Sequence, residues 1–169
     1  GAYQAILVGV NTVIRDNPHL GVRKRGRKDP IRIIMDSCLR IPLNARVLRD
    51  ASVIIATTSG APKAKLQNLK KRNIQVLVFK DARVPIKKLL AELRKLEIIS
   101  IFVEGGVDVL GRFIDAKIVD KVYAFCAPIL IGGKNNSIGG KGAQKIAQAF
   151  HFNTITTTAL GRDVLIVAQ

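Results

Sequence analysis

Tryptophan is absent from this chain of 169 residues, and aromatic residues make up only 5% of it. Domains that bind single-stranded nucleic acids stack bases on aromatic side chains, so this scarcity disfavours such a function. No apolar run approaches the roughly 18 residues that a membrane-spanning helix needs. The first residues also lack the basic and apolar regions of a signal peptide. We therefore expect a cytoplasmic protein that has no membrane partner.

Cysteine is nearly absent too, since the chain contains only Cys38 and Cys126, far apart in sequence. Both lie within apolar stretches, so we expect two reduced thiols in the core of a cytosolic protein. Neither has another cysteine or a histidine close in sequence, and no metal site is predicted.

Acidic residues are scarce relative to basic ones: 12 Asp and Glu stand against 28 Lys and Arg, for a formal net charge of +16. Such an excess attracts nucleic acids or small phosphorylated ligands. The basic residues are spread along the chain, with local concentrations at residues 23–28 and 63–72. We interpret the excess as solvated surface together with a field that attracts phosphates. A basic module that binds nucleic acid stays open as an alternative, although nucleic acid is not the partner we expect.

Short apolar runs rich in valine and isoleucine alternate with segments whose apolar residues recur at helical spacing. Strands are predicted at residues 5–10, 31–36, 53–57, 75–79, 98–103, 121–127, 153–158 and 163–168. Helices are predicted at residues 62–72 and 85–96, each opening on a proline. Such alternation is typical of a mostly parallel sheet covered on both faces. Residues 1–169 are thus predicted to form a single α/β domain.

The two ends of the chain differ from this pattern. Residues 160–162 join the last two predicted strands as a short turn, which indicates an antiparallel C-terminal hairpin at the edge of the sheet. Residues 131–142 form a glycine-rich loop between a strand and a short helix. At the other end, the chain begins almost directly on a strand apolar enough to be central. From this we expect that a segment upstream is missing.

The most informative segment is Glu104, Gly105 and Gly106, which separates a predicted buried strand from a helix. Two glycines allow a tight backbone turn, and the free N–H groups of a helix N-terminus bind phosphates. Ligands of open α/β sheets bind at the carboxyl ends of strands, where this turn would lie. A carboxylate there is costly without a partner, which makes Glu104 a candidate functional residue. A plain tight turn is the alternative, and the spacing does not match the GxGxxG fingerprint.

Two other strands are also followed by polar residues. After the first strand, Thr12 and Asp16 are four residues apart and would share one face of a helix, with Arg23 beyond as a possible phosphate ligand. After the second, Ser37 and Arg40 could hold a phosphate together. The alternatives are a helix terminus with turn chemistry around Asp16, and an Asx-type turn with a surface arginine at residues 36–40.

These segments, in this order and spacing, resemble the reductase domain of the bifunctional riboflavin-synthesis deaminase/reductases. The matching stretches run from one end of the chain to the other, and the block from EGG to IGG is highly specific. They are AILVGVNTVIRDNPHLGVR, DPIRIIMDSCLRIPLNARVL, IFVEGGVDVLGRFIDAKIVDKVYAFCAPILIGG and LGRDVLIVA.

The resemblance implies a dihydrofolate-reductase-like three-layer sandwich. It also implies the NADPH-dependent reduction of 5-amino-6-(5-phosphoribosylamino)uracil, whose ribosyl group is opened to a ribityl chain. That reaction needs no metal, because the nicotinamide supplies the hydride and the protein aligns it with the sugar. Members of the family are commonly dimers, so we expect a homodimer, with the apolar C-terminal strands as an interface.

The family's contacts carry over to this chain by position. The expected cofactor contacts are Thr12, Asp16, Ser37, Gly105, Gly106, Val107, Asp108, Val109, Leu110, Gly111 and Arg112. Arg40, beside Ser37, is the candidate for the 2′-phosphate of the cofactor. The expected substrate contacts are Leu20, Arg23 and Glu104, with Arg23 on the substrate phosphate. Asp16 and Glu104 are the expected catalytic carboxylates, and which of them relays a proton is open.

The chain departs from the family pattern in two ways. It lacks the H-x-E and P-C-x-x-C signature of the zinc deaminase half, so we expect no deamination and a deaminase domain only on a longer polypeptide. It also lacks the family's opening reductase strand and its Ser-Leu-Asp-Gly turn, so the domain is expected to be truncated at its N-terminus. An inactive fragment and a dihydrofolate-reductase-type enzyme therefore remain as further alternatives.

Overall fold

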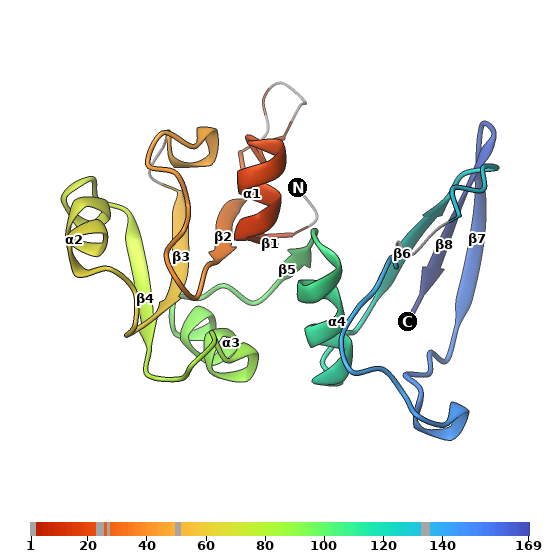
Figure 1. Ribbon diagram of the computed structural model, residues 1–169. Coiled ribbons are helices and arrows are strands. Elements are labelled where there is room, and N and C mark those ends of the chain that lie inside the picture. Colours follow the sequence, from red (N-terminus) through yellow and green to blue (C-terminus); the bar gives the residue numbers. More distant parts are fainter. Residues whose placement is uncertain (1–2, 23–25, 27, 50–51, 133–135) are drawn as a thin grey trace.

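The computed structural model describes residues 3–22, 26, 28–49, 52–132 and 136–169 and has the predicted alternation of strands and helices (Figure 1). The strands are β1 (Ala5–Gly9), β2 (Ile31–Met35), β3 (Val53–Thr58), β4 (Gln75–Phe79), β5 (Ile101–Val103), β6 (Val122–Cys126), β7 (Ile155–Leu160) and β8 (Asp163–Ala168). The helices are α1 (Val10–Asp16), α2 (Lys63–Lys71), α3 (Ile86–Lys95) and α4 (Val107–Asp115), with 3-10 turns η1 (Arg46–Leu48) and η2 (Ile146–Gln148). None of these described helices is long and apolar enough to cross a bilayer.

Five parallel strands form the main sheet in the order β4-β3-β2-β1-β5. The strands β1, β2 and β3 are buried over nearly their whole length, which explains why their sequences are continuous apolar runs. Successive side chains of each strand enter different cores. In β2, for example, Ile33 belongs to the cluster on one face and Ile34 to the cluster on the other.

The helices cover the two faces of this sheet in pairs. The amphipathic helix α3 places Leu89 and Leu93, both fully buried, in the same cluster as Phe113 of α4. On the opposite face, Val13 of α1 and Leu69 of α2 belong to the second cluster. Figure 1 shows α3 and α1 on opposite sides of the strands. The three-layer α/β arrangement that the sequence predicts is therefore confirmed.

Strand β5 is shorter than predicted because a side chain takes the place of a neighbouring strand at its start. Gln4 Oε1 accepts the backbone N–H groups of Ile99 and Ser100 at 2.8 and 3.1 Å. Ile98 is buried in the core although it lies outside the strand. The apolar run is therefore real, but only Ile101–Val103 pair with β1.

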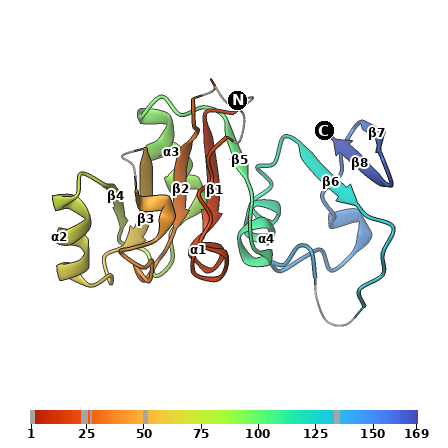
Figure 2. The ribbon, with the colours of Figure 1, turned by 90° about the horizontal axis from the view of Figure 1, so that it is seen from above.

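The C-terminal strands form a separate antiparallel sheet in the order β6-β8-β7 (Figures 1 and 2). The predicted hairpin is confirmed: Leu160 pairs with Asp163, and Gly161 in the turn has φ of 66°. Its predicted place at the edge of the parallel sheet was wrong, because within the described residues β8 pairs with β7 and β6, and neither β7 nor β8 pairs with a strand of that sheet. This sheet is covered much less than the first, and Phe125 and Ile155 are 68% and 66% exposed. The predicted short helix before it is a single 3-10 turn, η2.

The two sheets meet without strand pairing. In the described chain β5 pairs only with β1, and β6 only with β8, so each leaves one edge without a strand partner. Aromatic side chains connect β5 of the first sheet to β6 of the second. Phe102 of β5 lies between Tyr3 and Tyr123, with ring centroids 5.5 and 6.2 Å away, and the hydroxyl of Tyr3 donates to that of Tyr123 at 3.1 Å.

Both cysteines are exposed and free, so the prediction of two core thiols was wrong. Cys38 lies in the turn after β2, where the chain has left the buried sheet. Cys126 is the last residue of β6, in the sheet that is poorly covered. The apolar neighbours in sequence were real, but they belong to elements whose ends are open to solvent.

Candidate functional site

The predicted site residues extend from the carboxyl edge of the parallel sheet. α1 follows β1 and contributes Val10 and Val13 to the core on one face. α4 follows β5, which is paired with β1, and contributes Val109 and Phe113 to the core on the other face. The chain thus leaves two adjacent strands toward opposite faces, and open α/β sheets bind ligands at such a point.

The glycine turn after β5 packs against the first turn of α1. Gly105 has φ of 143°, and a Cβ on it would stand 3.4 Å from Thr12 Oγ1, so only glycine suits this position. The Glu104 N–H donates to the carbonyl of Leu7 at 2.9 Å and ties the turn to β1. Gly106 is the N-cap of α4, and no side chain of the described residues caps that helix. Bare backbone, a helix N-terminus and the Thr12 hydroxyl therefore converge in an arrangement suited to a phosphate.

The turn after β2 is held by a buried aspartate. Asp36 is 1% exposed, and its Oδ2 accepts the N–H of Ile41 at 2.7 Å. Leu39 within the turn has φ of 53°, in the left-handed region. Asp36 Oδ1 has no hydrogen-bond partner within the described residues. The turn that carries Ser37 and Arg40 therefore has a fixed backbone. The Asp36 side chain bonds the residue five positions on, not two, so it does not form the Asx-type turn given as the alternative.

The polar groups of this turn reach two different neighbours. Ser37 Oγ accepts the N–H of Val84 at 3.1 Å, which joins the turn to the loop after β4. The Arg40 guanidinium donates to Asn11 Oδ1 in the first turn of α1. The structure thus brings Ser37 and Arg40 to the same edge as Thr12 and the glycine turn.

Of the predicted cofactor residues in α4, those of its first turn reach this edge. Val107 is 41% exposed and Asp108 is also exposed, whereas Val109 is buried in the core. Gly111 is buried under residues 139–140, and Leu110 is half-buried. Residues 109–111 of the second turn therefore pack against other parts of the protein. Residues 105–108 are the ones exposed enough for direct contact with a cofactor.

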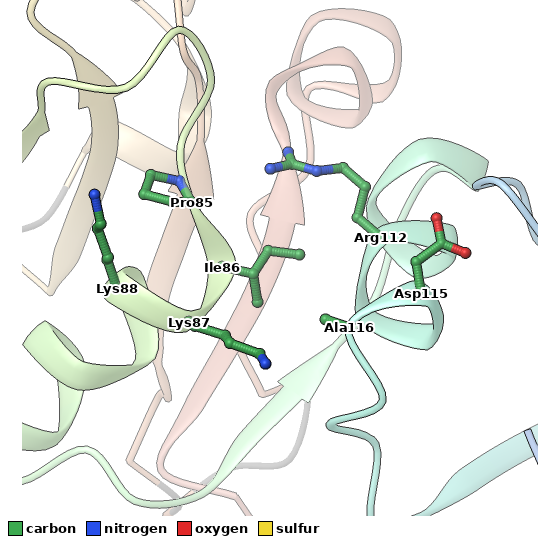
Figure 3. Close-up of a pocket in the computed structure, with 7 residues that line it drawn as sticks. All are labelled: Pro85, Ile86, Lys87, Lys88, Arg112, Asp115 and Ala116. Carbon is green, nitrogen blue, oxygen red and sulfur yellow. The ribbon is translucent and has the colours of Figure 1, made fainter.

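Arg112 extends from α4 toward the beginning of α3 (Figure 3), where its Nη2 donates to the carbonyl of Val84. It lines a pocket of about 460 Å³ together with Pro85, Ile86, Lys87, Lys88, Asp115 and Ala116. Burial lowers the pKa of Arg112, and the nearby positive charge of Arg83 lowers it further. Arg112 therefore acts on the site through the loop backbone that it holds.

The two predicted catalytic carboxylates have different surroundings. Asp16 ends α1 one turn beyond Thr12, and Arg15 binds it at 2.9 Å; this hydrogen bond lowers the pKa of the carboxyl. Asp16 is therefore a hydrogen-bond acceptor at neutral pH rather than a proton donor. Glu104 is exposed, so the expected desolvation cost was wrong, because its side chain leaves the sheet at the last residue before the turn.

Two of the three predicted substrate residues, Leu20 and Glu104, lie in the described part of the chain. Leu20, with φ of 59°, is half-buried and packs against the core on the α1 side. Arg23 lies outside the described residues. Val22 before it is anchored by its N–H, which donates to Asp29 Oδ1 at 2.7 Å.

Sequence reasoning missed the loop after β4. Arg83 forms an ion pair with Asp108 at 2.9 Å, and its neighbour Val84 is held by Ser37 and Arg112. The available signal was position alone, since residues 80–85 follow a predicted parallel strand at the same edge. Asn11, the partner of Arg40, was missed for the same reason.

Comparison with known proteins decides the family. Residues 2–166 match the family described as the RibD C-terminal domain. The chain belongs to this family. It is 37% identical over 164 residues to the 2,5-diamino-6-ribosylamino-4(3H)-pyrimidinone 5′-phosphate reductase of Aquifex aeolicus, covering 95% of this chain and 73% of that protein. It is also 37% identical, over 171 residues, to the riboflavin biosynthesis protein RibD of Actinobacillus pleuropneumoniae.

The solved structures agree with this assignment. RibD of Acinetobacter baumannii superimposes with a TM-score of 0.83 at 25% identity, over 98% of this RibD C-terminal domain and 46% of that chain. The match to RibD of Actinobacillus pleuropneumoniae likewise covers 97% of this chain and 45% of that protein. The chain thus spans less than half the length of the RibD proteins and about three quarters of the Aquifex reductase.

Proposed function

We propose that this RibD C-terminal domain is an NADPH-dependent reductase of riboflavin biosynthesis that acts on 5-amino-6-(5-phosphoribosylamino)uracil. The observation that carries the proposal is the glycine turn at residues 104–106, packed against Thr12 where β1 and β5 send their helices to opposite faces. Relatives named as reductases of a closely related ribosylamino-pyrimidinone phosphate support the substrate class.

The residues at this edge fit a phosphorylated dinucleotide. The position of Gly105 leaves its backbone bare, the N-terminus of α4 lacks a side-chain cap among the described residues, and Ser37 and Arg40 lie beside it. Thr12, Ser37, Arg40, Asp16 and residues 105–108 are our proposed direct cofactor contacts, and residues 109–112 would support them from the second turn of α4. When bound, NADPH would supply the hydride that reduces C1 of the ribosyl group, in its ring-opened imine form, to a ribityl carbon.

The chain's own groups would bind and orient the sugar. Glu104, Leu20 and Arg23 are the proposed substrate residues, with Arg23 on the phosphate. Since Arg15 holds Asp16 in its ionised form, Asp16 would accept hydrogen bonds from the ligand. Glu104, at the end of β5, is then our candidate for relaying the proton that the reduced C–N unit takes up.

Titration of intrinsic NADPH fluorescence tests cofactor binding, and oxidation of NADPH at 340 nm tests turnover. The uracil substrate and its 2,5-diamino-pyrimidinone counterpart should be compared, because the Aquifex relative is named for the latter. Failure to bind NADPH at micromolar concentration, with or without either substrate, would refute the reductase proposal. Binding without turnover of either substrate would support the alternative of an inactive fragment.

Two substitutions test the site. Glu104→Gln should lower kcat by about 100-fold or more with little change in KM, because general acid–base groups contribute about 10²–10⁴ in rate. Arg23→Ala should mainly raise KM for the substrate. Glu92→Gln, a carboxylate of α3 paired with Lys95, is the matched control and should change neither constant. Retention of wild-type kcat by the Glu104 variant would remove that residue from the catalytic role.

We also propose a cytoplasmic homodimer. On the β6-β8-β7 sheet, Tyr123 and Phe125 are 37% and 68% exposed on one face, and Ile155 and Val164 are 66% and 39% exposed on the other, so both faces carry exposed apolar side chains. Sedimentation equilibrium of wild type and Phe125→Asp measures the association. A deaminase domain on a longer polypeptide is part of the same proposal.

A further inference from the structure

The loop after β4 reaches across the carboxyl edge of the sheet and is fixed there through one residue. Val84 is fully buried; its N–H donates to Ser37 Oγ at 3.1 Å and its carbonyl accepts from Arg112. Ser37 belongs to the turn after β2 and Arg112 to α4. The backbone at Val84 is therefore held from both sides, and the residue before it has a defined place at the proposed cofactor site.

That residue is Arg83, and its guanidinium lies at the first turn of α4. Nη2 of Arg83 donates to both carboxylate oxygens of Asp108, at 3.1 and 2.9 Å. Within the described part of the chain, these are the hydrogen bonds that the side chain makes, so Nη1 and Nε still have N–H groups to offer. The Arg83 side chain is 63% exposed and hence accessible to a ligand.

The charges around Asp108 indicate which ligand this arrangement suits. In a dinucleotide site, an unpaired carboxylate accepts a hydrogen bond from a free ribose 2′-hydroxyl and repels a 2′-phosphate, whereas an arginine accommodates the phosphate. Arg83 covers the Asp108 carboxylate and adds N–H donors in its place. Arg40, beyond Ser37 in the neighbouring turn, provides a second guanidinium. Two guanidiniums on loops that meet at the Ser37 hydroxyl suit a dianionic phosphate.

We propose that Arg83, positioned by Asp108 and by the anchored Val84 backbone, is a specificity-determining residue that selects the 2′-phosphate of NADPH over the free 2′-hydroxyl of NADH. The inference rests on the proposed function. It adds Arg83, a residue that the family resemblance did not identify. Asp108 then acts as a positioning residue: it holds the guanidinium in the absence of ligand and does not itself contact the phosphate.

The test is a set of fluorescence titrations of the 169-residue chain with NADPH and with NADH, supplemented by calorimetric titration with 2′,5′-ADP and 5′-AMP. Arg83→Ala should weaken NADPH and 2′,5′-ADP by about 10-fold or more and change NADH and 5′-AMP by less than about 2-fold, since one charge-assisted contact is lost. Arg83→Lys should recover only part of the loss, because an ammonium is not a planar fork. Asp108→Asn should weaken NADPH by less than Arg83→Ala does.

Lys80→Ala is the matched control, because it removes one exposed positive charge from the same loop. It should leave the ratio of the two dissociation constants unchanged. Equal losses for NADPH and NADH in Arg83→Ala, or a Lys80→Ala effect as large, would overturn the inference while leaving the reductase proposal intact. A wild-type chain that binds neither nucleotide would overturn both. Thermal unfolding of each variant shows whether an affinity change comes from lost folding. If Arg83→Ala does not fold, the ratio of the NADPH and NADH dissociation constants in Arg83→Lys tests the inference instead.

Discussion

Replacing Gly111 by alanine sets two physical effects of opposite sign against each other. Gly111 lies within α4, where alanine is favoured over glycine by about 0.5–1 kcal/mol because it restricts the unfolded chain. A Cβ at this position, however, would overlap the backbone of Gly139 and Gly140. The loop at residues 139–142 lies directly on the helix, so it would have to move away.

The cost of that movement follows from the hydrogen bonds that hold the loop. Gly139 N–H donates to the Val107 carbonyl at 3.0 Å, and the N–H groups of Lys141 and Gly142 donate to the Asp115 carboxylate at 2.8 and 3.3 Å. Each is worth about 0.5–1.5 kcal/mol net, so losing all of them costs about 1.5–4.5 kcal/mol. After the helix preference is subtracted, Gly111→Ala should lower the free energy of unfolding by about 0.5–4 kcal/mol.

Urea unfolding followed by far-ultraviolet circular dichroism measures this difference. Gly60→Ala is the control, because its Cβ would meet only Thr58 Oγ1 at 3.7 Å, an ordinary contact. That variant should stay within about 0.5 kcal/mol of wild type, as is usual for surface substitutions. A Gly111 variant as stable as wild type, or more stable, would refute the close approach of the loop to α4.

Two further predictions concern the core and the charged end of α1. Leu89→Ala should lower the free energy of unfolding by about 2–5 kcal/mol, as removal of a fully buried leucine does, and a loss below 1 kcal/mol in urea unfolding would contradict the packing of α3. The Asp16 carboxyl should titrate below its ordinary pKa of 3.8, and Arg15→Ala should raise that pKa in a carbon-detected NMR titration. Because the pKa is lowered in the folded state, any stability that this pair adds is present above pH 3.8 and is lost as the pH falls through the lowered value. An unchanged Asp16 pKa in the Arg15 variant would mean that the pair does not form in solution.

Local sequence patterns were sufficient to predict the strands of the parallel sheet. Strands such as Val53–Thr58 are buried on both faces, so their apolar runs are continuous and visible in the sequence. The amphipathic stripe of α3 was equally readable, because Leu89 and Leu93 are a single turn apart on its buried face. The hairpin between β7 and β8 followed from the short turn at Gly161.

Local sequence patterns could not predict the contacts between segments that are distant in the chain. The pairing of Gln4 with residues 99–100 shortens β5, and nothing in either segment alone indicates it. The same holds for Ser37 and Val84, which are 47 residues apart and together bring Arg83 to the site. The family resemblance predicted Thr12 and Ser37 by position, and the structure places both at the carboxyl edge of the sheet; of the residues that it predicted in α4, Val109 and Gly111 are buried against protein.

The open edge of β5 has a consequence for how this protein behaves in concentrated solution. Glu104 N–H and the Ser100 carbonyl both point toward β1, so the alternate residues Ile101 and Val103 direct their N–H and C=O groups outward. Within the described residues, β6 also has one edge without a strand partner, and its Tyr123 ring lies beside Phe102 of β5. Edges of this kind can accept an extended backbone segment, so solubility should depend on keeping such segments away. The amide protons of Ile101 and Val103 would then report that contact directly, through their rates of exchange with deuterium.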